Sequence, residues 1–561
     1  MKRRRGQAGQ VALQTAVAIV LTWPLVGRLT NEIPLGQEPT PTVPYFNLWT
    51  LRWNAQQLAH GYSDYWNAPI FAPSRASFAR SEAQPLTGFV FAILRSVCED
   101  VAAYNLITIG FLALNGVAGV AIARRLGATA APAALAGIVA QSLPFVFNQF
   151  GVLQLVCVFP MLFAFERLIA YQRSRKLSAA LGIAVWFVVC DLTSGYYAVF
   201  LAIALACAVP IMAVGVVPWK QLARDVGACA LLTALLLGPY AISQSRHTSD
   251  AAWSRQTVTA LSMQFGDYRD HAGGSFGLWL WENDANDNGL LESPGTYLTG
   301  LGIAGLVIAI RRRQRRLATA VVITAAGALL LSMGFHLSIL GWRPYEMIFE
   351  HIPGFERLRS PFRFSVVVQV ALLVVAPLTL HALWQWRRSL GRALAIAVTV
   401  LAVVETGSIG RSATQARGFA QLATTRVPDV ATYDWVKFLR RSEAGTVAMV
   451  PFAARGSAGH FADTTVAMSA ALEHGHPLAN GYTGLFPTDF DPLWRAMDDV
   501  ASRCGVQQLQ ARGVRYLVIA HDWFTDSSHA ELNDLGFARV FEGTSRSVYE
   551  DVKRSPYRNE C

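Results

Sequence analysis

The sequence predicts an all-α domain that crosses the membrane about eleven times, followed by a small soluble α/β domain. Hydrophobic residues make up 53% of the 561 residues and charged residues only 15%, whereas soluble domains average about 25% charged residues. Apolar runs that approach the roughly 20 residues of a membrane-crossing helix recur through residues 1–410. Residues 411–561 have the composition of a soluble protein.

The predicted spans follow one another with short turns between most of them. The chain starts with basic residues before an apolar run, but no small-residue cleavage site follows, so we expect an uncleaved first span. The spans are expected at about 9–28, 103–123, 128–147, 149–170, 177–193, 195–217, 225–243, 295–310, 317–334, 363–384 and 390–408.

The basic residues indicate which side of the membrane each turn occupies. With the N-terminus inside, the inward turns hold 19 lysines and arginines, whereas the outward turns at 148 and 194 hold none. This asymmetry is typical of a multi-pass membrane protein with its N-terminus in the cytoplasm. The formal net charge of +11 therefore reflects topology, and we expect no nucleic-acid partner.

Three long loops and the C-terminal domain are predicted on the outer face. The loops cover residues 31–86, 244–294 and 335–362, and the first is polar, aromatic and rich in proline. Loops this long are usually functional or disordered, and the aromatic content of 31–86 argues for function. The apolar piece 86–94 is too short to cross, so we interpret it as interfacial or re-entrant.

The pattern after residue 411 predicts the elements of a small α/β domain. Residues 430–441 have a helical pattern, and 446–450 and 515–520 are short apolar runs typical of buried strands. Residues 538–542 and 547–550 are expected to form a closing strand pair. Whether Cys504 and Cys561 form a disulfide is left open.

Three acidic residues are candidates for chemistry on the outer face. Glu38 follows the first span by about ten residues, Glu82 precedes the short apolar piece, and Asp191 ends the run GIAVWFVVC. A carboxylate can act as the base that activates an acceptor, and an acid at a membrane helix end is a functional candidate by default. The alternative is that Glu38 and Glu82 are solvated loop residues and that Asp191 caps the next helix.

Arginines gather in the third outer loop, where the positive-inside rule disfavours them. Arg357, Arg359 and Arg363 precede a span within GFERLRSPFRF. A guanidinium binds phosphate oxygens in a bidentate fork, so these residues suit the phosphate of a polyprenyl lipid. Anchoring to anionic lipid is the alternative.

Two other motifs have a structural alternative. Trp49, Trp53, Tyr65 and Trp66 could stack on an acceptor or sugar ring, although such residues more often form an interfacial belt. The glycines at 300, 302 and 305, in GLGIAG, match a dinucleotide fingerprint but lie within an apolar span. We interpret them as sites of close helix packing.

The order of these parts resembles the GT-C superfamily of membrane glycosyltransferases, which includes protein O-mannosyltransferases and aminoarabinose transferases. The resemblance is carried by the first helix, the long outer loop with an acid, the re-entry at Gln84-Pro85-Leu86, and the span AYNLITIGFLALNGVAGVAIARRLG. The segments IPGFERLRSPFRF and HGHPLANGYTGLFP also resemble bacterial membrane proteins placed near that superfamily. The family usually carries an aspartate in the first loop, where this chain has Glu38.

The resemblance implies an inverting glycosyltransferase of the bacterial inner membrane. It would move a sugar from a polyprenyl-phosphate-linked donor to an outward-facing glycan, lipid or protein acceptor. Glu38 would be the base, Glu82 or Asp191 would orient the acceptor or hold a divalent cation, and the three arginines would hold the phosphate. Two other classes remain open: a transporter or lipid flippase, and a non-catalytic membrane protein that presents its C-terminal domain to partners.

The first prediction concerns topology. Reporter fusions after Arg125, Lys176 and Arg316 should report the cytoplasm, because the inward turns carry the basic residues. A fusion after Glu550 should report the outer side. The measurement is a paired cytoplasmic and periplasmic reporter assay, and a cytoplasmic result after Glu550 would overturn the outward placement of the C-terminal domain.

Overall fold

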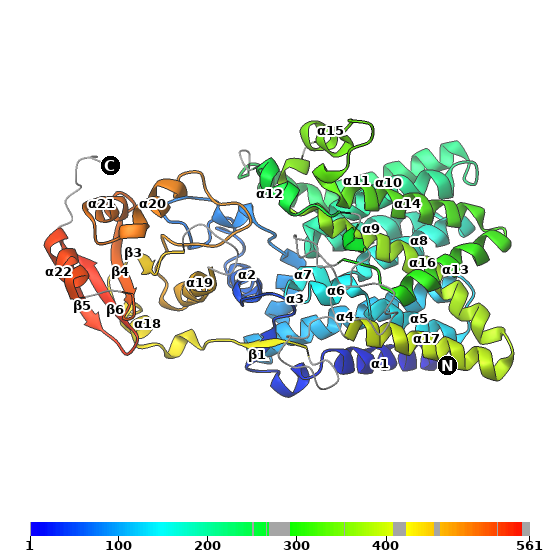
Figure 1. Cartoon of the computed structure of the whole chain (residues 1–561), viewed down its shortest axis with the longest axis horizontal. Coiled ribbons are helices and arrows are strands. Elements are labelled where there is room, and N and C mark those ends of the chain that lie inside the picture. The colour runs from blue at the N-terminus through cyan, green and yellow to red at the C-terminus, as the bar shows by residue number, and fades with distance from the viewer. Residues whose placement is uncertain are drawn as a thin grey trace. The chain divides into compact units, whose positions relative to one another are not determined.

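The computed structural model describes residues 2–248, 252–264, 266–268, 292–352, 354–407, 422–453, 461–523 and 526–552. These residues divide into two compact units (Figure 1). The helical unit comprises 1–37, 102–242 and 252–424, and the mixed unit comprises 38–101, 243–251 and 425–561. Most of the first outer loop therefore belongs to the same unit as the C-terminal residues. The predicted domain boundary at 410 stays a prediction.

The helical unit is built almost entirely of α-helices. The short strand β1 (Glu32–Pro34) follows its first helix, and β2 (Thr424–Arg426) begins where the unit ends. Its helices are α1 (Lys2–Leu21), α4 (Asp100–Arg125), α5 (Ala130–Gln141), α6 (Pro144–Asn148), α7 (Leu153–Val156), α8 (Phe159–Ser174), α9 (Leu177–Thr193), α10 (Gly195–Ala213), α11 (Trp219–Ser245), α12 (Arg255–Ala260), α13 (Thr296–Arg311), α14 (Arg315–Ser332), α15 (Pro344–His351), α16 (Ser365–Gln385) and α17 (Arg388–Gly407).

Every predicted span coincides with a helix or a helix pair. Among the described residues, eight segments are long and apolar enough to cross a membrane: Asp100–Arg125, Ala130–Asn148, Leu153–Ser174, Gly195–Ala213, Trp219–Ser245, Arg315–Ser332, Pro361–Gln385 and Arg388–Thr406. The segments Gly6–Leu21, Leu177–Thr193 and Thr296–Arg311 are apolar but shorter. The prediction of an all-α membrane domain is confirmed, and the total of eleven crossings stays a prediction.

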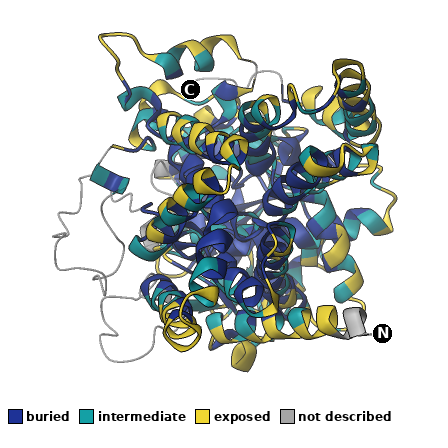
Figure 2. Ribbon diagram, turned by 90° about the vertical axis from the view of Figure 1, so that its right-hand side faces the viewer, coloured by how far each residue is buried: buried dark blue, intermediate teal, exposed yellow. Residues whose placement is uncertain are grey.

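The apolar helices differ in how much of their length is buried inside the protein. The span that contains α16 is 83% buried inside the protein, whereas that of α11 is only 6% buried. Leu231, Leu235 and Leu236 of α11 are more than half exposed, as a lipid-facing helix requires. Figure 2 shows dark blue buried helices in the interior of this unit and exposed yellow faces at its periphery.

The glycines of α13 allow close helix packing, as predicted. A Cβ atom on Gly305 would lie 2.3 Å from the carbonyl oxygen of Val375 in α16, and one on Gly302 would lie 2.7 Å from a methyl carbon of Leu372. Neither approach is possible for a residue with a side chain. The fingerprint is therefore a packing motif.

Two of the predicted spans are broken near one end. A break separates α5 from α6 at Pro144, and another separates α7 from α8 before Phe159. The Gln369 Oε1 accepts a hydrogen bond from the Phe145 N–H at 3.1 Å. The Asn115 Oδ1 accepts from the Phe159 N–H at 2.7 Å, and its Nδ2 donates to a carbonyl of α7. Side-chain amides thus replace the backbone hydrogen bonds lost at both breaks.

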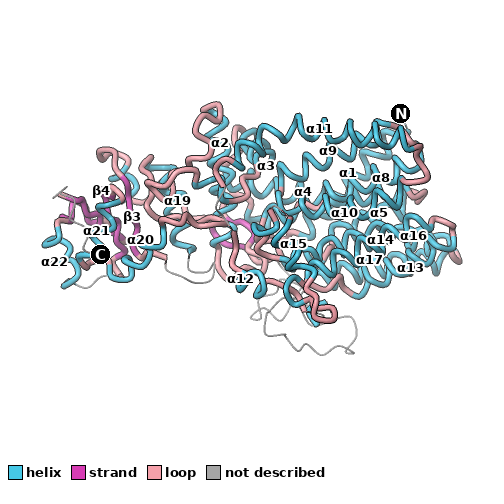
Figure 3. Tube along the Cα trace, turned by 90° about the horizontal axis from the view of Figure 1, so that it is seen from above, coloured by secondary structure: helices cyan, strands magenta, loops and turns pink. Residues whose placement is uncertain are grey.

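The mixed unit combines helices with a four-stranded sheet (Figure 3). The sheet order is β3-β4-β6-β5, with β3 and β4 parallel and the other neighbours antiparallel. The predicted α/β domain and its four strands are confirmed. The elements are α2 (Thr42–Ala59), α3 (Pro85–Leu94), α18 (Asp434–Leu439), β3 (Thr446–Val450), α19 (Ala462–His474), α20 (Phe490–Ala496), α21 (Arg503–Ala511), β4 (Val514–Ala520), α22 (Asp526–Leu535), β5 (Phe537–Glu542) and β6 (Arg546–Asp551).

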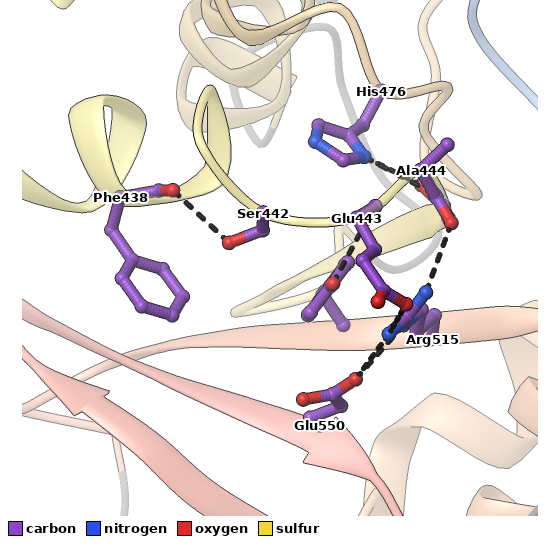
Figure 4. Close-up of polar contacts among 9 residues, drawn as sticks. Phe438, Ser442, Glu443, Ala444, His476, Arg515 and Glu550 are labelled. Carbon is purple, nitrogen blue, oxygen red and sulfur yellow. Dashed lines mark hydrogen bonds and ion pairs between the residues drawn. The ribbon is translucent and has the colours of Figure 1, made fainter.

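A charged network fixes the chain between α18 and β3 to the sheet (Figure 4). The guanidinium of Arg515 in β4 donates to Glu550 Oε1 of β6 at 2.7 Å and to Glu443 Oε2 at 2.6 Å. It also donates to the Ala444 carbonyl at 3.3 Å. The side chain of Arg515 is 19% exposed, so these charge-assisted bonds are partly shielded from water.

The second prediction tests this network. Arg515→Met should lower the free energy of unfolding of the mixed unit by about 1–2 kcal/mol, because two carboxylates lose a shared donor at a partly buried site. Hydrogen–deuterium exchange of peptides from β4 and β6 would measure the loss.

The matched control is Arg539→Met, which removes an exposed pair with Glu542 in the same sheet. It should change the free energy of unfolding by less than about 0.5 kcal/mol. Equal exchange in the two variants would contradict a structural role for the Arg515 network.

Candidate active site

A buried carboxyl lies at the start of α13 in the helical unit. Glu292 is 2% exposed, and the Gln149 Nε2 donates a hydrogen bond to its Oε1 at 3.2 Å. Its Oε2 is also buried and accepts no hydrogen bond of normal geometry from the residues that the structure describes. A buried polar atom left in this state is expensive in free energy and is typical of a site that receives a ligand.

Amide side chains surround this carboxyl. Asn148 ends α6, and its Oδ1 accepts from the Gln37 Nε2 at 3.2 Å. The Gln369 Nε2 donates to the carbonyl of Ser293, the residue after Glu292, at 3.4 Å. The Glu405 carboxylate accepts from the Thr296 N–H at 2.7 Å and so caps α13. Hydrogen bonds at Glu292 itself, at Ser293 and at Thr296 therefore fix the position of the Glu292 carboxyl.

Burial raises the pKa of Glu292 to about 8, because water no longer solvates the carboxylate. Hydrogen bonds from Asn148 and Gln149 and the charge of Arg363 act in the opposite direction and are too weak to restore the ordinary value. Glu292 is therefore mainly a neutral acid at pH 7. In that form it can donate a hydrogen bond to an anion.

Arg363 supplies a buried cation beside this acid. Arg363 is 9% exposed, and its Nε has no hydrogen-bond partner among the described residues. The guanidinium carbon lies 4.9 Å from the centre of the Tyr196 ring. A buried guanidinium is costly unless an anion or hydrogen-bond acceptor compensates for lost water.

Arg359 lies against the same tyrosine, and Arg357 lies beside Glu356. The Arg359 N–H donates to the Tyr196 Oη at 3.2 Å, and its guanidinium lies 5.1 Å from the Trp253 ring centre. The Arg357 Nε is 3.6 Å from a carboxylate oxygen of the adjacent Glu356. The structure thus brings Arg359 and Arg363 together around Tyr196.

The groups of this site occupy the same ends of their helices. Asn148 ends the span that starts beyond the inward pair Arg124 and Arg125, and Glu292 precedes α13, which runs toward the basic turn at 311–316. Arg363 lies at the opposite end of its span from the basic residues at 387–392. With the predicted topology, all three therefore lie on the outer side.

The three predicted acids are placed as follows. Glu38 is half-buried in the turn before α2 and directly follows Gln37 in the chain, and Glu82 is half-buried before α3. Both belong to the mixed unit. Asp191 is half-buried in the last turn of α9, five residues before Tyr196. The catalytic and acceptor roles of the three acids stay predictions.

The predicted stacking residues form an aromatic core in the mixed unit. Trp49, Trp53, Tyr65 and Trp66 are each at most 8% exposed, and the ring of Phe78 lies within 6.4 Å of all four. The Trp53 Nε1 donates to the Tyr65 carbonyl at 3.0 Å, and the Tyr65 hydroxyl donates to Asn54 at 2.8 Å. Their observed surroundings are those of a packed core, and stacking on a sugar stays a prediction.

Sequence patterns did not single out Glu292, Asn148 and Gln149. The available signal was weak: Glu292 is an acid just before an apolar span, and Asn148 and Gln149 are adjacent amides in an outward turn. What could not be read from the sequence is that these three positions meet, since about 140 residues separate the amides from the acid.

The donors of this site do not suit a divalent cation. No group of three His, Cys, Asp or Glu side chains placed to hold a metal occurs among the described residues. Within the described ranges the helical-unit site offers one neutral carboxyl, amides and a guanidinium, whereas Mg²⁺ and Ca²⁺ prefer several charged oxygen ligands. We therefore assign no metal-dependent step to these residues.

Comparisons with known proteins agree with the predicted fold. The sequence profile of a family described as "Domain of unknown function (DUF6311)" matches residues 55–406. No curated protein matches the sequence. The structure of the arabinofuranosyltransferase AftD from Mycobacteria is similar with a TM-score of 0.52 and 14% identity over 98% of this chain. This chain spans 41% of that protein, and the likeness confirms a GT-C fold.

Two further solved structures resemble the chain more weakly. The structure of ArnT from Cupriavidus metallidurans in the apo state has a TM-score of 0.49 and 14% identity, with 98% of this chain and 99% of that one covered. The oligosaccharyltransferase from Archaeoglobus fulgidus has a TM-score of 0.48 and 12% identity, with 97% and 73% covered.

The third prediction concerns the neutral state of Glu292. Because its folded pKa of about 8 exceeds the ordinary value of 4.5, its contribution to stability is fully present below the ordinary pKa and is lost as the pH rises through about 8. From about pH 6 to about pH 9, the melting temperature of the parent should therefore fall more steeply than that of Glu292→Gln.

Thermal unfolding in lipid nanodiscs at several pH values would measure these slopes. Glu531→Gln, at an exposed position of α22, is the matched control and should follow the parent. Parallel slopes for the parent and Glu292→Gln would show that Glu292 does not titrate in this range.

Proposed function

We propose that this chain, which belongs to the DUF6311 family and has a GT-C fold, is a membrane glycosyltransferase. It would transfer a sugar from a polyprenyl-phosphate-linked donor to an outward-facing acceptor, with inversion at the anomeric carbon. A multi-pass fold shared with an arabinofuranosyltransferase supports this reaction class. The location proposed for the protein is the bacterial inner membrane, with the C-terminal residues on the outer side.

The observation that carries the proposal is that Arg363 and Glu292 are both buried, within electrostatic range of each other. A guanidinium and a neutral carboxylic acid, both at most 9% exposed, lie at the proposed outer ends of apolar helices. The guanidinium can bind two phosphate oxygens, and the acid can donate a hydrogen bond to a third without electrostatic repulsion. This combination suits the phosphate of a lipid-linked donor whose chain lies in the bilayer.

The remaining steps need a base and a route for the proton. The acceptor hydroxyl attacks the anomeric carbon from the face opposite the phosphate, the new C–O bond forms, and the bond between the sugar and phosphate oxygen breaks. The acceptor proton passes to a carboxylate, for which we propose Glu38. Arg363, with Arg359 nearby, offsets the charge that develops on the departing polyprenyl phosphate.

The fourth prediction tests both ends of the reaction. Glu38→Gln should reduce transfer from a lipid-linked sugar about 10²–10⁴-fold at normal protein abundance, because a general base is lost. Glu38→Asp should retain part of the activity. Arg363→Lys should weaken donor binding, because lysine keeps the charge and loses the planar fork. The measurements are single-turnover transfer from a radiolabelled polyprenyl-phosphate sugar and binding of polyprenyl phosphate.

Glu82→Gln and Asp191→Asn, made in the same background, are the controls. If Glu38→Gln transfers at the parental rate while one control is inactive, the base belongs to that control residue. If every variant retains full transfer, the glycosyltransferase proposal fails, and a transporter or a non-catalytic presenting protein would replace it.

A further inference from the structure

A cavity of about 300 Å³ lies in the C-terminal part of the mixed unit. Its lining includes Met449 near the end of β3, Ala520 at the end of β4, and Asp522 just beyond it. The two strands are adjacent and parallel, with Val450 opposite Ile519. Ligands of α/β sheets typically bind outside the carboxyl ends of parallel strands, and this volume is at the lower end of the range for ligand sites.

Charged side chains of both signs line this cavity. Asp463 projects from the first turn of α19 and Asp522 from the segment after β4, and both are exposed. Arg546, at the start of β6, donates from its Nη1 to the Val450 carbonyl at 3.0 Å. Burial lowers the pKa of Arg546, and the charges of Asp463 and Asp522 oppose that shift, which places both carboxylates within electrostatic range of it.

An aromatic wall completes the cavity. The rings of Tyr433 and Trp435 lie 6.1 Å apart, and both residues are part of the lining. Trp435 is 2% exposed, yet its Nε1–H has no hydrogen-bond acceptor among the described residues. The Nε1 atom itself is buried, so it is the indole ring of Trp435, with the ring of Tyr433, that contributes to the wall of the cavity.

The walls are held by contacts that do not involve the cavity-facing charges. The Asp434 carboxylate accepts from the Trp435 N–H at 2.7 Å and from the Thr544 hydroxyl at 2.7 Å. The His521 N–H donates to the Ser545 carbonyl at 3.1 Å. These bonds join the segments that carry Trp435, Asp522 and Arg546, so the cavity is formed before a ligand binds.

We propose that this cavity binds a neutral saccharide. Sugar hydroxyls can donate to Asp463 and Asp522 and accept from Arg546, while the apolar face of a sugar ring can pack against the aromatic wall. Two carboxylates against one guanidinium leave the lining with a net negative charge, which disfavours phosphorylated ligands. The assignment of this saccharide as part of the acceptor rests on the proposed transferase function, but the binding itself does not.

The fifth prediction measures binding without turnover. The full chain is reconstituted in lipid nanodiscs, because sugar-based detergents would compete for the cavity. The probes are neutral methyl glycosides of mannose, galactose and arabinose, with a hexose phosphate as the anionic comparison. At least one neutral glycoside should slow hydrogen–deuterium exchange in the peptides that contain Trp435, Asp522 and Arg546.

Substitutions identify the cavity as the site of that protection. Asp522→Asn should weaken binding about tenfold or more, because hydrogen bonds to a charged group contribute about 1.5–3 kcal/mol. Tyr433→Leu, which removes one ring of the aromatic wall, should weaken binding about fivefold. The matched control, Asp491→Asn at an exposed position of α20 outside the cavity, should bind as the parent does.

Three results would overturn the proposal: no protection by any neutral glycoside at millimolar concentration, equal binding by the parent and Asp522→Asn, or binding of the hexose phosphate alone. If the parent protein binds a neutral glycoside but transfers no sugar from a lipid-linked donor, the result counts against the proposed function only. Loss of binding with transfer intact would count against this cavity only.

Discussion

A chain that bends within a bilayer must satisfy its own backbone hydrogen-bonding groups, because lipid offers no donors or acceptors. In the helical unit, buried amides meet this constraint at the two breaks in the spans. Gln369 supports the start of α6, and Asn115 supports both sides of the break between α7 and α8. These breaks permit α6 to end at Asn148, so the amides beside Glu292 depend on them.

The same scarcity of water determines the charges of the candidate active site. Glu292 is neutral at pH 7 because burial removes the solvation of its carboxylate, and the nearby Arg363 is too weak a partner to restore ionisation. A buried cation beside a neutral acid carries a net positive charge. The helical unit therefore presents a site that favours an anion.

The mixed unit depends on pairing between segments that are far apart in the sequence. The Phe71 N–H donates to the Asn480 carbonyl at 3.0 Å, and the Leu478 N–H donates to the Pro69 carbonyl at 3.0 Å. The Tyr45 hydroxyl donates to the Arg426 carbonyl at 2.5 Å. Residues of the 31–86 loop are therefore held in place by hydrogen bonds to C-terminal residues. Glu38, the proposed base, and the saccharide cavity belong to one compact unit.

The class of protein, the positions of the apolar helices and the strands of the C-terminal sheet can all be predicted from the amino-acid sequence. These features depend on local composition and periodicity: a run such as that of α16 is apolar on every side, and a run such as TVAMV favours a buried strand. It also identified Arg363, because a cation there opposes the charge bias of the turns.

The surroundings of each side chain, in contrast, follow from the tertiary structure. It placed Glu292 against Gln149, buried Trp49 and Trp53 around Phe78, and formed the cavity between Trp435, Asp522 and Arg546. Local sequence patterns cannot specify these contacts. The burial and pKa of a side chain depend on segments that contact it from distant parts of the chain. Glu38 and Glu292 are both acids in loops predicted on the outer face, and packing distinguishes a half-buried carboxyl from one removed from water.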